Sequence, residues 1–445
     1  MTADTIAALA TGAGRAGVAI VRVSGPHAGA CIDALTQTPR PAPHRAALRA
    51  IAHSQTREQI DEGLVLFMPA PASFTGEDVA EFHVHGGQAI IAALIDALTS
   101  LPNVRIAEPG EFTRRAFERG KLDLTQAEAV ADLVDAETEG QRKQALRQYR
   151  GELQNRIEQW RSALIAIMAL CEAEIDFPDE DLPDQLAQTA RPQIAALAAE
   201  LASFLEDAHR GERVREGYRI AIIGAPNAGK SSLLNALAQR EAAIVSDIPG
   251  TTRDVVEVRL VLAGFPVWIA DTAGLREARD VVEAEGVRRA LERARDADLR
   301  IAVMDSRAPE IPDAIRAHDF AVFSKSDIAP PSAEAIHAAL DCELEAYVVS
   351  ARTGAGMAEL LAALEARVAR ALAAEESAPI TRARHRAQIE AAHAALLRAD
   401  AAFGQGAELA AEDLRLAARA LGRITGRVDV EDILGEIFSR FCIGK

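Results

Sequence analysis

One loop constrains the fold of this chain more than any other stretch. Residues 220–232 read IAIIGAPNAGKSS, in which Gly224, Gly229, Lys230 and Ser231 match the G-x-x-x-x-G-K-[ST] pattern of a phosphate-binding loop. The apolar residues before the loop are typical of a buried strand in a parallel sheet. Glycines let backbone amides close around phosphates, and the N-terminus of the following helix attracts anions. The sequence therefore predicts a nucleoside triphosphate site, with Lys230 on the β- and γ-phosphates and Ser231 on Mg²⁺.

Further segments follow the loop at the spacing of a GTP-binding domain. Gly250–Thr252 lies in a polar loop, where a threonine can complete the Mg²⁺ shell and respond to the γ-phosphate. Asp271–Gly274 ends a strand-like run, so its carboxylate can hold Mg²⁺ through water and its glycine N–H can meet the γ-phosphate. Asp327, in the segment Ser324–Asp327, can accept two hydrogen bonds from guanine, a donor pair that adenine lacks. Val348–Ala351 is predicted to lie behind the base.

Two positions depart from the usual GTPase pattern. Ser324 stands where the guanine motif N-K-x-D normally has asparagine, although Lys325 and Asp327 are kept, so we predict that the preference for guanine survives. Leu275 stands where small regulatory GTPases place a glutamine that orients water. An arginine finger contributes roughly 10³–10⁵ in rate, so another group must supply orientation and positive charge if hydrolysis is fast.

The composition limits the class of protein. The chain has 445 residues, a net charge of −17 and four widely spaced cysteines without a C-x-x-C pair. This length predicts about two to four domains. The acidic balance disfavours a broadly basic surface that coats nucleic acid, although it leaves room for one local basic face. The cysteine spacing indicates a reducing compartment, with neither a disulfide framework nor a zinc module. Because no run approaches about 18 apolar residues, we expect a cytoplasmic protein without a membrane segment.

The residue pattern changes along the chain. Residues 1–120 mix strand-like and helical patterns, whereas 121–217 and 374–445 are helical and flank the nucleotide segment at 218–373. Thr125–Glu128 reads as a T-x-x-E capping box that starts a helical pattern running to about residue 174. We therefore predict an N-terminal α/β domain and an all-α domain interrupted by an inserted P-loop GTPase domain of the Ras-like α/β type. The expected N-terminal strands and helix are at 19–23, 63–68, 79–84 and 88–98.

Several features have two interpretations. His83 and His85 share one strand face and could bind a metal, but no third ligand is apparent and an ordinary polar strand face is favoured. The acidic loop 177–184 could hold a cation or be a solvated turn. The basic residues of 382–386 could meet the phosphates of a nucleic acid or form a solvated helix end. Three cysteines carry no motif and are predicted to be inert packing residues, namely Cys31, Cys171 and Cys342.

Taken together, these motifs resemble the tRNA-modification GTPase family called MnmE or TrmE, and the resemblance spans the whole chain. The segments that carry it are Phe74–Asp78, His85–Gly87, Pro109–Phe112, Lys121–Leu124, Asp176–Glu180, Gly250–Asp254, Asp271–Arg276 and Phe441–Lys445. The resemblance implies an N-terminal folate-binding α/β domain that dimerises, a helical domain and an inserted GTPase domain. The residue pattern predicts the same arrangement.

The resemblance also implies a reaction and its cofactors. With a flavoprotein of the MnmG type, in a heterotetramer that uses FAD and NADH, such a GTPase adds an aminomethyl or carboxymethylaminomethyl group to C5 of the wobble uridine of certain tRNAs. The carbon comes from a tetrahydrofolate derivative, 5-formyl or 5,10-methylene, while GTP, Mg²⁺ and K⁺ serve the GTPase domain. The alternative is a GTPase switch in ribosome assembly or RNA chaperoning, without modification chemistry.

The resemblance assigns roles residue by residue. Potassium stands in for an arginine finger, Glu283 orients water, and Cys442 is a candidate chemical residue, although from the sequence alone Glu283 is one of several charges that open a helix and a thiol such as Cys442 is often simply buried. Ser246 replaces the common threonine and Pro249 a common small residue. The folate contacts are Arg22, Glu81, Lys121 and Lys445, the Mg²⁺ ligands are Ser231 and Thr252, and the K⁺ ligands are Asn227, Ser246, Ile248 and Thr251. The predicted GTP-binding residues are Asn227, Ala228, Gly229, Lys230, Ser231, Ser232, Ser246, Asp247, Ile248, Pro249, Gly250, Thr251, Thr252, Asp271, Thr272, Ala273, Gly274, Ser324, Lys325, Ser326, Asp327, Ser350, Ala351 and Arg352.

Overall fold

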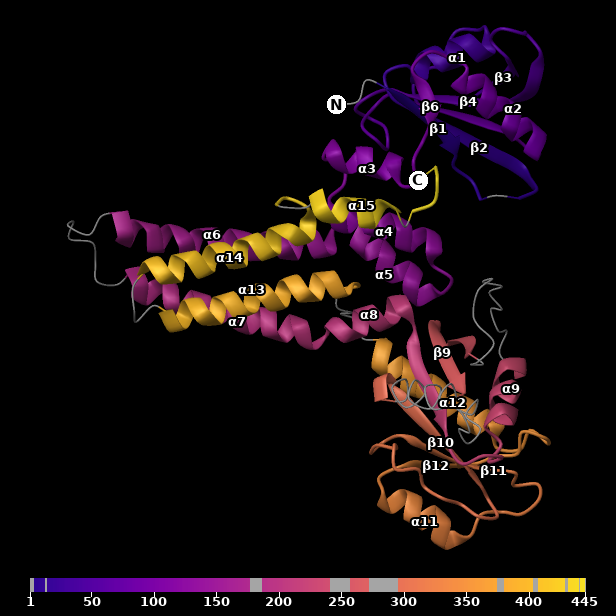
Figure 1. Cartoon of the computed structure of the whole chain (residues 1–445), viewed down its shortest axis with the longest axis vertical. Coiled ribbons are helices and arrows are strands. Elements are labelled where there is room, and N and C mark those ends of the chain that lie inside the picture. Colours follow the sequence, from indigo (N-terminus) through magenta and orange to yellow (C-terminus); the bar gives the residue numbers. More distant parts are fainter. Residues whose placement is uncertain are drawn as a thin grey trace, which may run out of the picture. The chain divides into compact units, whose positions relative to one another are not determined.

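The chain folds into two compact units. The first contains residues 1–134, 148–195 and 394–445, and the second contains residues 135–147 and 196–393. The computed structural model describes residues 4–12, 14–176, 186–240, 257–271, 295–373, 380–402, 407–428, 431–439 and 441–444 (Figure 1). Within these residues, no helix is both long enough and apolar enough to cross a membrane.

The first unit contains a mixed sheet of six strands, counted over the described residues, in the order β3-β4-β5-β2-β1-β6. Its elements are β1 (Thr5–Leu9), β2 (Ala16–Ser24), α1 (Ala28–Thr36), β3 (Ala47–Ala52), β4 (Gln59–Met68), β5 (Val79–Gly86), α2 (Gln88–Thr99) and β6 (Val104–Ile106). The strands and helix predicted at 19–23, 63–68, 79–84 and 88–98 are confirmed as parts of β2, β4, β5 and α2. Val21 and Phe82 alternate inward to a core shared with α1 and α2, so the cross-strand neighbours Arg22 and Glu81 lie on the opposite face.

The C-terminal residues pack against the N-terminal part of this unit. Helix α3 (Glu111–Glu118) follows Gly110, and α15 (Glu431–Ser439) lies beside α3. Gly110 has φ of +69°, and a Cβ there would lie 2.7 Å from the carbonyl oxygen of Phe438. Gly444, with φ of +97°, would place a Cβ 2.0 Å from the carbonyl oxygen of Leu9. Only glycine fits both positions, which explains the glycines of the P-G-E-F and C-I-G-K segments.

The helices that follow α3 belong partly to the first unit and partly to the second. The helical pattern predicted from 125 to about 174 is three helices, α4 (Leu124–Asp135), α5 (Glu139–Tyr149) and α6 (Glu152–Asp176), and Gly151 with φ of +85° separates the last two. Helix α6 runs beside α14 (Ala407–Thr425) (Figure 1), and Arg415 pairs with Glu172 at 3.2 Å. The residues of α7 (Leu186–Glu206) and α13 (Ala383–Ala402) are divided between the two units, and the shorter α8 (Ala208–Glu216) belongs to the second.

The capping box predicted at Thr125–Glu128 is wrong. The helix begins at Leu124, and the box is formed by Asp123 and Gln126. The Asp123 carboxylate accepts the Gln126 N–H at 2.8 Å, and the Gln126 side chain accepts the Asp123 N–H at 3.0 Å. Asp123–Gln126 and Thr125–Glu128 both have capping-box spacing, but Thr125 already lies inside the helix and its hydroxyl donates to the Asp123 carboxylate at 2.7 Å.

The second unit contains the predicted Ras-like α/β fold. Its sheet has the order β12-β11-β10-β7-β9-β8 among the described residues, with all pairs parallel except β8 with β9. The elements are β7 (Tyr218–Ile223), α9 (Lys230–Arg240), β8 (Glu257–Leu262), β9 (Phe265–Asp271), β10 (Leu299–Asp305), β11 (Phe320–Ser324), α11 (Ala333–Asp341), β12 (Glu345–Val348) and α12 (Met357–Leu372). Ile222, Val303 and Val322 form the centre of its core.

Residues 135–147 belong to the second unit because they pack on the turn between β8 and β9. The Gly140 N–H donates to the carbonyl of Gly264 at 3.0 Å, and Glu137 forms an ion pair with Arg259. A Cβ at Gly140 would lie 2.4 Å from the Phe265 ring. The start of α5 is thereby attached to the hairpin that precedes the Asp271 end of β9.

Candidate functional site

The loop between β7 and α9 has the backbone geometry that the sequence predicted. Gly224 has φ of +146°, and a Cβ there would lie 2.1 Å from the carbonyl oxygen of Val303. Asn227 and Gly229 also have positive φ, of +60° and +97°. The Lys230 ammonium donates to the carbonyls of Gly224 at 2.7 Å and Ala225 at 2.8 Å. These contacts hold the lysine across the loop at the start of α9, where a phosphate ligand would be bound.

The end of β11 is tied to this loop. The Ser324 hydroxyl donates to the carbonyl of Ala228 at 2.5 Å, and the Lys325 ammonium donates to the carbonyl of Asn227 at 2.6 Å. Lys325 also pairs with Asp305 at 2.8 Å, at the end of β10. Hydrogen bonds from Arg307 and then from Lys325 hold the pKa of the Asp305 carboxyl well below its usual range. The negative charge of Asp305 therefore keeps Lys325 bent over the phosphate-binding loop.

Asp327 and the segment after β12 lie together. One oxygen of the Asp327 carboxylate accepts the Ser350 hydroxyl at 2.7 Å, and Arg352 approaches the other at 3.6 Å. Ser350 is fully buried and its oxygen also accepts the Thr353 N–H at 3.2 Å, which fixes the hydroxyl. The side chain of Arg352 is 85% exposed, whereas that of Asp327 is 13% exposed. The described parts of the predicted GTP site thus converge at the carboxyl ends of β7, β11 and β12.

Of the remaining predicted GTP-site residues, most fall in 241–256 and 272–294, which are not among the described residues. Asp271 ends β9. Ser246, Asp247, Ile248, Pro249, Gly250, Thr251, Thr252, Thr272, Ala273, Gly274 and Glu283 lie outside the described residues, as does the loop 177–184. The donors that are described fit the expected groups. The loop has the glycine cradle that phosphates need, and Ser231 at the start of α9 has a hydroxyl oxygen of the hard type that Mg²⁺ prefers.

On the sheet face of the first unit that lies away from α1 and α2, Arg22 and Glu81 meet. Both Nε and Nη2 of Arg22 lie 2.9 Å from one Glu81 oxygen, and His83 Nε2 lies 3.1 Å from the other. The Arg22 guanidinium is 5.6 Å from the ring centroid of Phe74. Lys121 donates instead to the carbonyl of Pro71 at 3.1 Å, and Lys445 lies outside the described residues. The contact between His83 and Glu81 was not predicted from the sequence.

The metal interpretation of the histidine pair has no support in the described part of the chain, which holds no group of three metal-binding side chains. His83 contacts Glu81, whereas the His85 ring contacts Asp61 at 2.9 Å. The prediction of an ordinary polar strand face is therefore the better interpretation.

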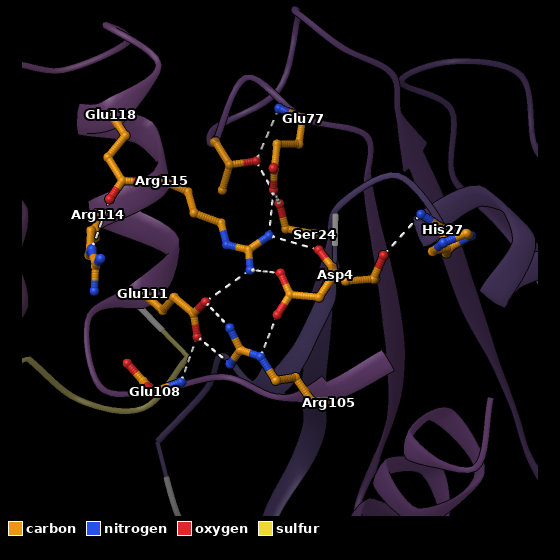
Figure 2. Close-up of polar contacts among 12 residues, drawn as sticks. Asp4, Ser24, His27, Glu77, Arg105, Glu108, Glu111, Arg114, Arg115 and Glu118 are labelled. Carbon is orange, nitrogen blue, oxygen red and sulfur yellow. Dashed lines mark hydrogen bonds and ion pairs between the residues drawn. The ribbon is translucent and has the colours of Figure 1, made fainter. Parts of the chain in front are cut away.

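A buried charge network that the sequence did not predict joins α3 to Asp4, Glu77 and Arg105 (Figure 2). Arg115 of α3 is 5% exposed and donates to Asp4 at 3.0 Å, to Glu111 at 2.9 Å and to Glu77 at 3.2 Å. Arg105 also contacts two of these carboxylates, donating to Asp4 at 2.6 Å and to Glu111 at 2.8 Å. Burial raises the pKa of the Glu111 carboxyl, but hydrogen bonds from Arg105, the Glu108 backbone and Arg115 outweigh it, so that the pKa is lowered overall. The pKa of the Asp4 carboxyl is lowered in the same way. Burial raises this pKa, but the hydrogen bonds and charges of Arg105 and Arg115 outweigh the effect of burial.

We expect the network to make the stability of the first unit depend on pH. Asp4 and Glu111 have lowered pKa values in the folded state, so the stability that they contribute is complete above about pH 5 and is lost as the pH falls through those values. Asp123 acts in the opposite direction, because burial raises the pKa of its carboxyl. Urea unfolding at about pH 7, 5 and 3.5 measures the net slope. Glu111→Gln should flatten the slope, and an unchanged slope would contradict the role of the network.

The burial of the cysteines agrees only in part with the prediction. Cys31 and Cys171 are buried as expected, and burial raises the pKa of the Cys31 thiol to about 12. Cys342 is exposed, so its predicted packing role is wrong, because it follows the end of α11 at the surface. Cys442 is also exposed, which excludes the interpretation that it is simply buried.

The segment 382–386 is not an open basic surface. His385 is fully buried. Arg386 pairs with Glu212 at 3.0 Å and with Glu390 at 3.3 Å, so carboxylates of this unit already balance its charge. The contacts favour the helix-end interpretation over a tRNA-phosphate site.

Comparison with known proteins covers the whole chain. A family model described as the GTP-binding protein TrmE N-terminus matches residues 5–121, and a model described as the MnmE helical domain matches residues 124–442. Proteins named tRNA modification GTPase MnmE are 55% identical in Parvibaculum lavamentivorans, over 99% of this chain and 100% of that protein, and 54% identical in Caulobacter vibrioides, over the same shares. A protein of the same name from Rhodospirillum rubrum is 52% identical over 100% of both chains. With the phosphate-binding loop and the α/β sheets in place, this similarity shows that the chain belongs to the MnmE family of tRNA modification GTPases.

Proposed function

We propose that this chain is a potassium-dependent GTPase that takes part in modifying the wobble uridine of certain tRNAs. The observation that carries the proposal is the joint presence of two chemically distinct polar sites in one chain. One is the loop at Gly224–Lys230 with Asp327 beside it, and the other is the Arg22–Glu81 pair. A switch without modification chemistry needs only the first of these. No observation favours the alternative in ribosome assembly or RNA chaperoning.

In the GTPase domain, the residues bind and orient the nucleotide. Lys230 and the loop amides bind the phosphates, and Asp327 accepts hydrogen bonds from guanine. Ser231 and Thr252 hold Mg²⁺, which neutralises phosphate charge when bound. Asn227, Ser246, Ile248 and Thr251 hold K⁺ in place of an arginine finger, and Glu283 orients the attacking water. The other predicted nucleotide contacts keep the roles that the resemblance gives them.

In the N-terminal domain, the polar pair binds a tetrahydrofolate derivative. The pterin ring presents an N–H and an amino group side by side, and the Glu81 carboxylate can accept both, with Arg22 holding the carboxylate in place. Lys121 and Lys445 supply positive charge for the anionic tail. Cys442 is exposed on the C-terminal segment and is a candidate for chemistry. The carbon transfer further needs an MnmG-type flavoprotein with FAD and NADH.

The same proposal covers the organisation of the protein. The domain boundaries are 1–120, 121–217, 218–373 and 374–445, with dimerisation through the first domain. We place the homodimer and its flavoprotein partner in the cytoplasm. The support is membership of the family together with the matches to its N-terminal and helical models.

The deciding experiment is mass spectrometry of tRNA from cells that lack the gene and are complemented with either wild type or Glu81→Gln. Wild type should restore the modified wobble uridine. The variant should not, because an amide replaces one of the two acceptors with donors, while GTP hydrolysis by the purified variant stays normal. Unchanged modification in the cells without the gene would reject the proposed function. Full restoration by the variant would reject the folate role of Glu81 alone.

A further inference from the structure

Ser324 occupies a fixed position between β11 and the phosphate-binding loop. It is 5% exposed, and its hydroxyl lies 2.5 Å from the carbonyl oxygen of Ala228. Its own carbonyl accepts the Ser306 N–H at 3.1 Å and the Ser306 hydroxyl at 2.6 Å. A Cβ at Gly229 would lie 3.2 Å from the Ser324 hydroxyl, so the loop packs closely over this side chain. The serine cannot turn elsewhere without giving up these contacts.

The number of hydrogens on the side chain limits what residue 324 can recognise. A carbonyl oxygen has no hydrogen to give, so in the contact with Ala228 the serine hydroxyl must be the donor. A hydroxyl has one hydrogen, whereas the amide of an asparagine has two. An asparagine here could donate to the loop and also to an acceptor of a bound base. Ser324 can do only the first.

The two edges of guanine are therefore not recognised alike. One edge carries the acceptors N7 and O6, and the other carries the N1–H and the amino group, which a carboxylate can accept. One Asp327 oxygen accepts the Ser350 hydroxyl at 2.7 Å and Arg352 approaches the other at 3.6 Å, and each oxygen has a second lone pair that can accept a hydrogen from those donors. Lys325 is already directed at Asn227 and Asp305.

We propose that Ser324 leaves N7 of a bound guanine without a hydrogen bond from residue 324, because its single hydrogen is used on the phosphate-binding loop. It is a positioning residue for the loop, and discrimination rests on the donor edge that Asp327 binds. The inference rests on the GTP binding of the proposed function. It predicts that a nucleotide in which carbon replaces N7 binds as well as GTP.

The test compares GTP with 7-deaza-GTP by calorimetry on the full-length protein. Wild type should bind both with dissociation constants within about twofold. Ser324→Asn should bind GTP about 3- to 10-fold more tightly than 7-deaza-GTP, the effect of one hydrogen bond. Ser324→Ala removes the contact with the loop, so it should weaken both nucleotides and leave their ratio unchanged.

The outcomes separate the inference from the function. A wild-type protein that binds 7-deaza-GTP about fivefold or more weakly than GTP would contradict the inference. A loss of affinity of that size corresponds to about one hydrogen bond, so N7 would be recognised. If wild type binds neither nucleotide, GTP binding itself fails and the inference fails with it. Should the asparagine variant not fold, the wild-type ratio still decides.

Discussion

Arg115→Met is expected to lower the free energy of unfolding of the first unit by about 3–5 kcal/mol. Arg115 is 5% exposed and is the donor to Asp4, Glu77 and Glu111. Methionine fills a similar volume, so little of the loss arises from packing. It leaves buried carboxylates without one of their cations, and the cost of burying those charges uncompensated dominates. Within the described part of the chain, the Glu77 carboxylate then keeps the Arg119 guanidinium and the Ser24 hydroxyl as its side-chain donors.

The chain offers a matched control and a local reporter. Arg114 is the preceding residue of α3, and its pair with Glu118 is 50% exposed on both sides, so Arg114→Met should change stability by less than about 1 kcal/mol. Because the chain has two units, unfolding need not be a single transition. The two tryptophans of the chain lie in different units, so Trp268→Phe leaves Trp160 to report on the first. Equal effects of the two arginine substitutions would show that the network contributes no more than a surface pair.

Asp327→Asn is expected to weaken GTP binding by a factor between about 10² and 10⁴. The estimate takes two hydrogen bonds to a charged acceptor at about 1.5–3 kcal/mol each. An amide retains one acceptor but turns a donor towards the base, so it cannot accept both guanine hydrogens. It should instead bind xanthine, which carries an oxygen where guanine has its amino group.

Competition with a labelled nucleotide measures both effects. Wild type should prefer GTP and the variant should prefer xanthosine triphosphate, which shows that the domain is still folded. Asp313→Asn is the control, because Asp313 is an exposed aspartate of the same unit. A variant that binds both nucleotides as wild type does would remove Asp327 from base recognition.

The elements that could be predicted are those whose residues carry a strong local pattern. The second sheet was predictable because buried parallel strands are continuous apolar runs, as in Ile220–Ile223. The sequence did not predict β1, β3 or β6. These strands are short or half-exposed, and β1 (TIAAL) and β3 (ALRAIA) are rich in alanine, so neither alternation nor β-branched residues distinguish them. The break between α5 and α6 depends on the backbone at Gly151, which periodicity alone does not reveal.

The candidate site divides in the same way. The residues of the phosphate-binding loop lie at fixed spacing within one short stretch, and so do those of the guanine motif. The sequence alone therefore identifies both motifs. The contact between Arg115 and Asp4 joins residues 111 positions apart, and no spacing rule brings them together. The contact of His83 with Glu81 depends on which strand face is uncovered, and that is decided by the packing of α1 and α2 on the other side.

The packing of Phe438 on Gly110, and of Gly444 on Leu9, has a consequence for biosynthesis. The ribosome makes β1 and α3 early, but it makes α15 only after the whole second unit has emerged. Until then the apolar surface that Phe438 and Phe441 cover, at Leu124 and Ala127, has no partner from the C-terminal segment. We expect nascent chains arrested before residue 431 to be cleaved by protease in this region, and full-length chains to resist. The first part of the protein to be synthesised is thus completed by one that is made much later.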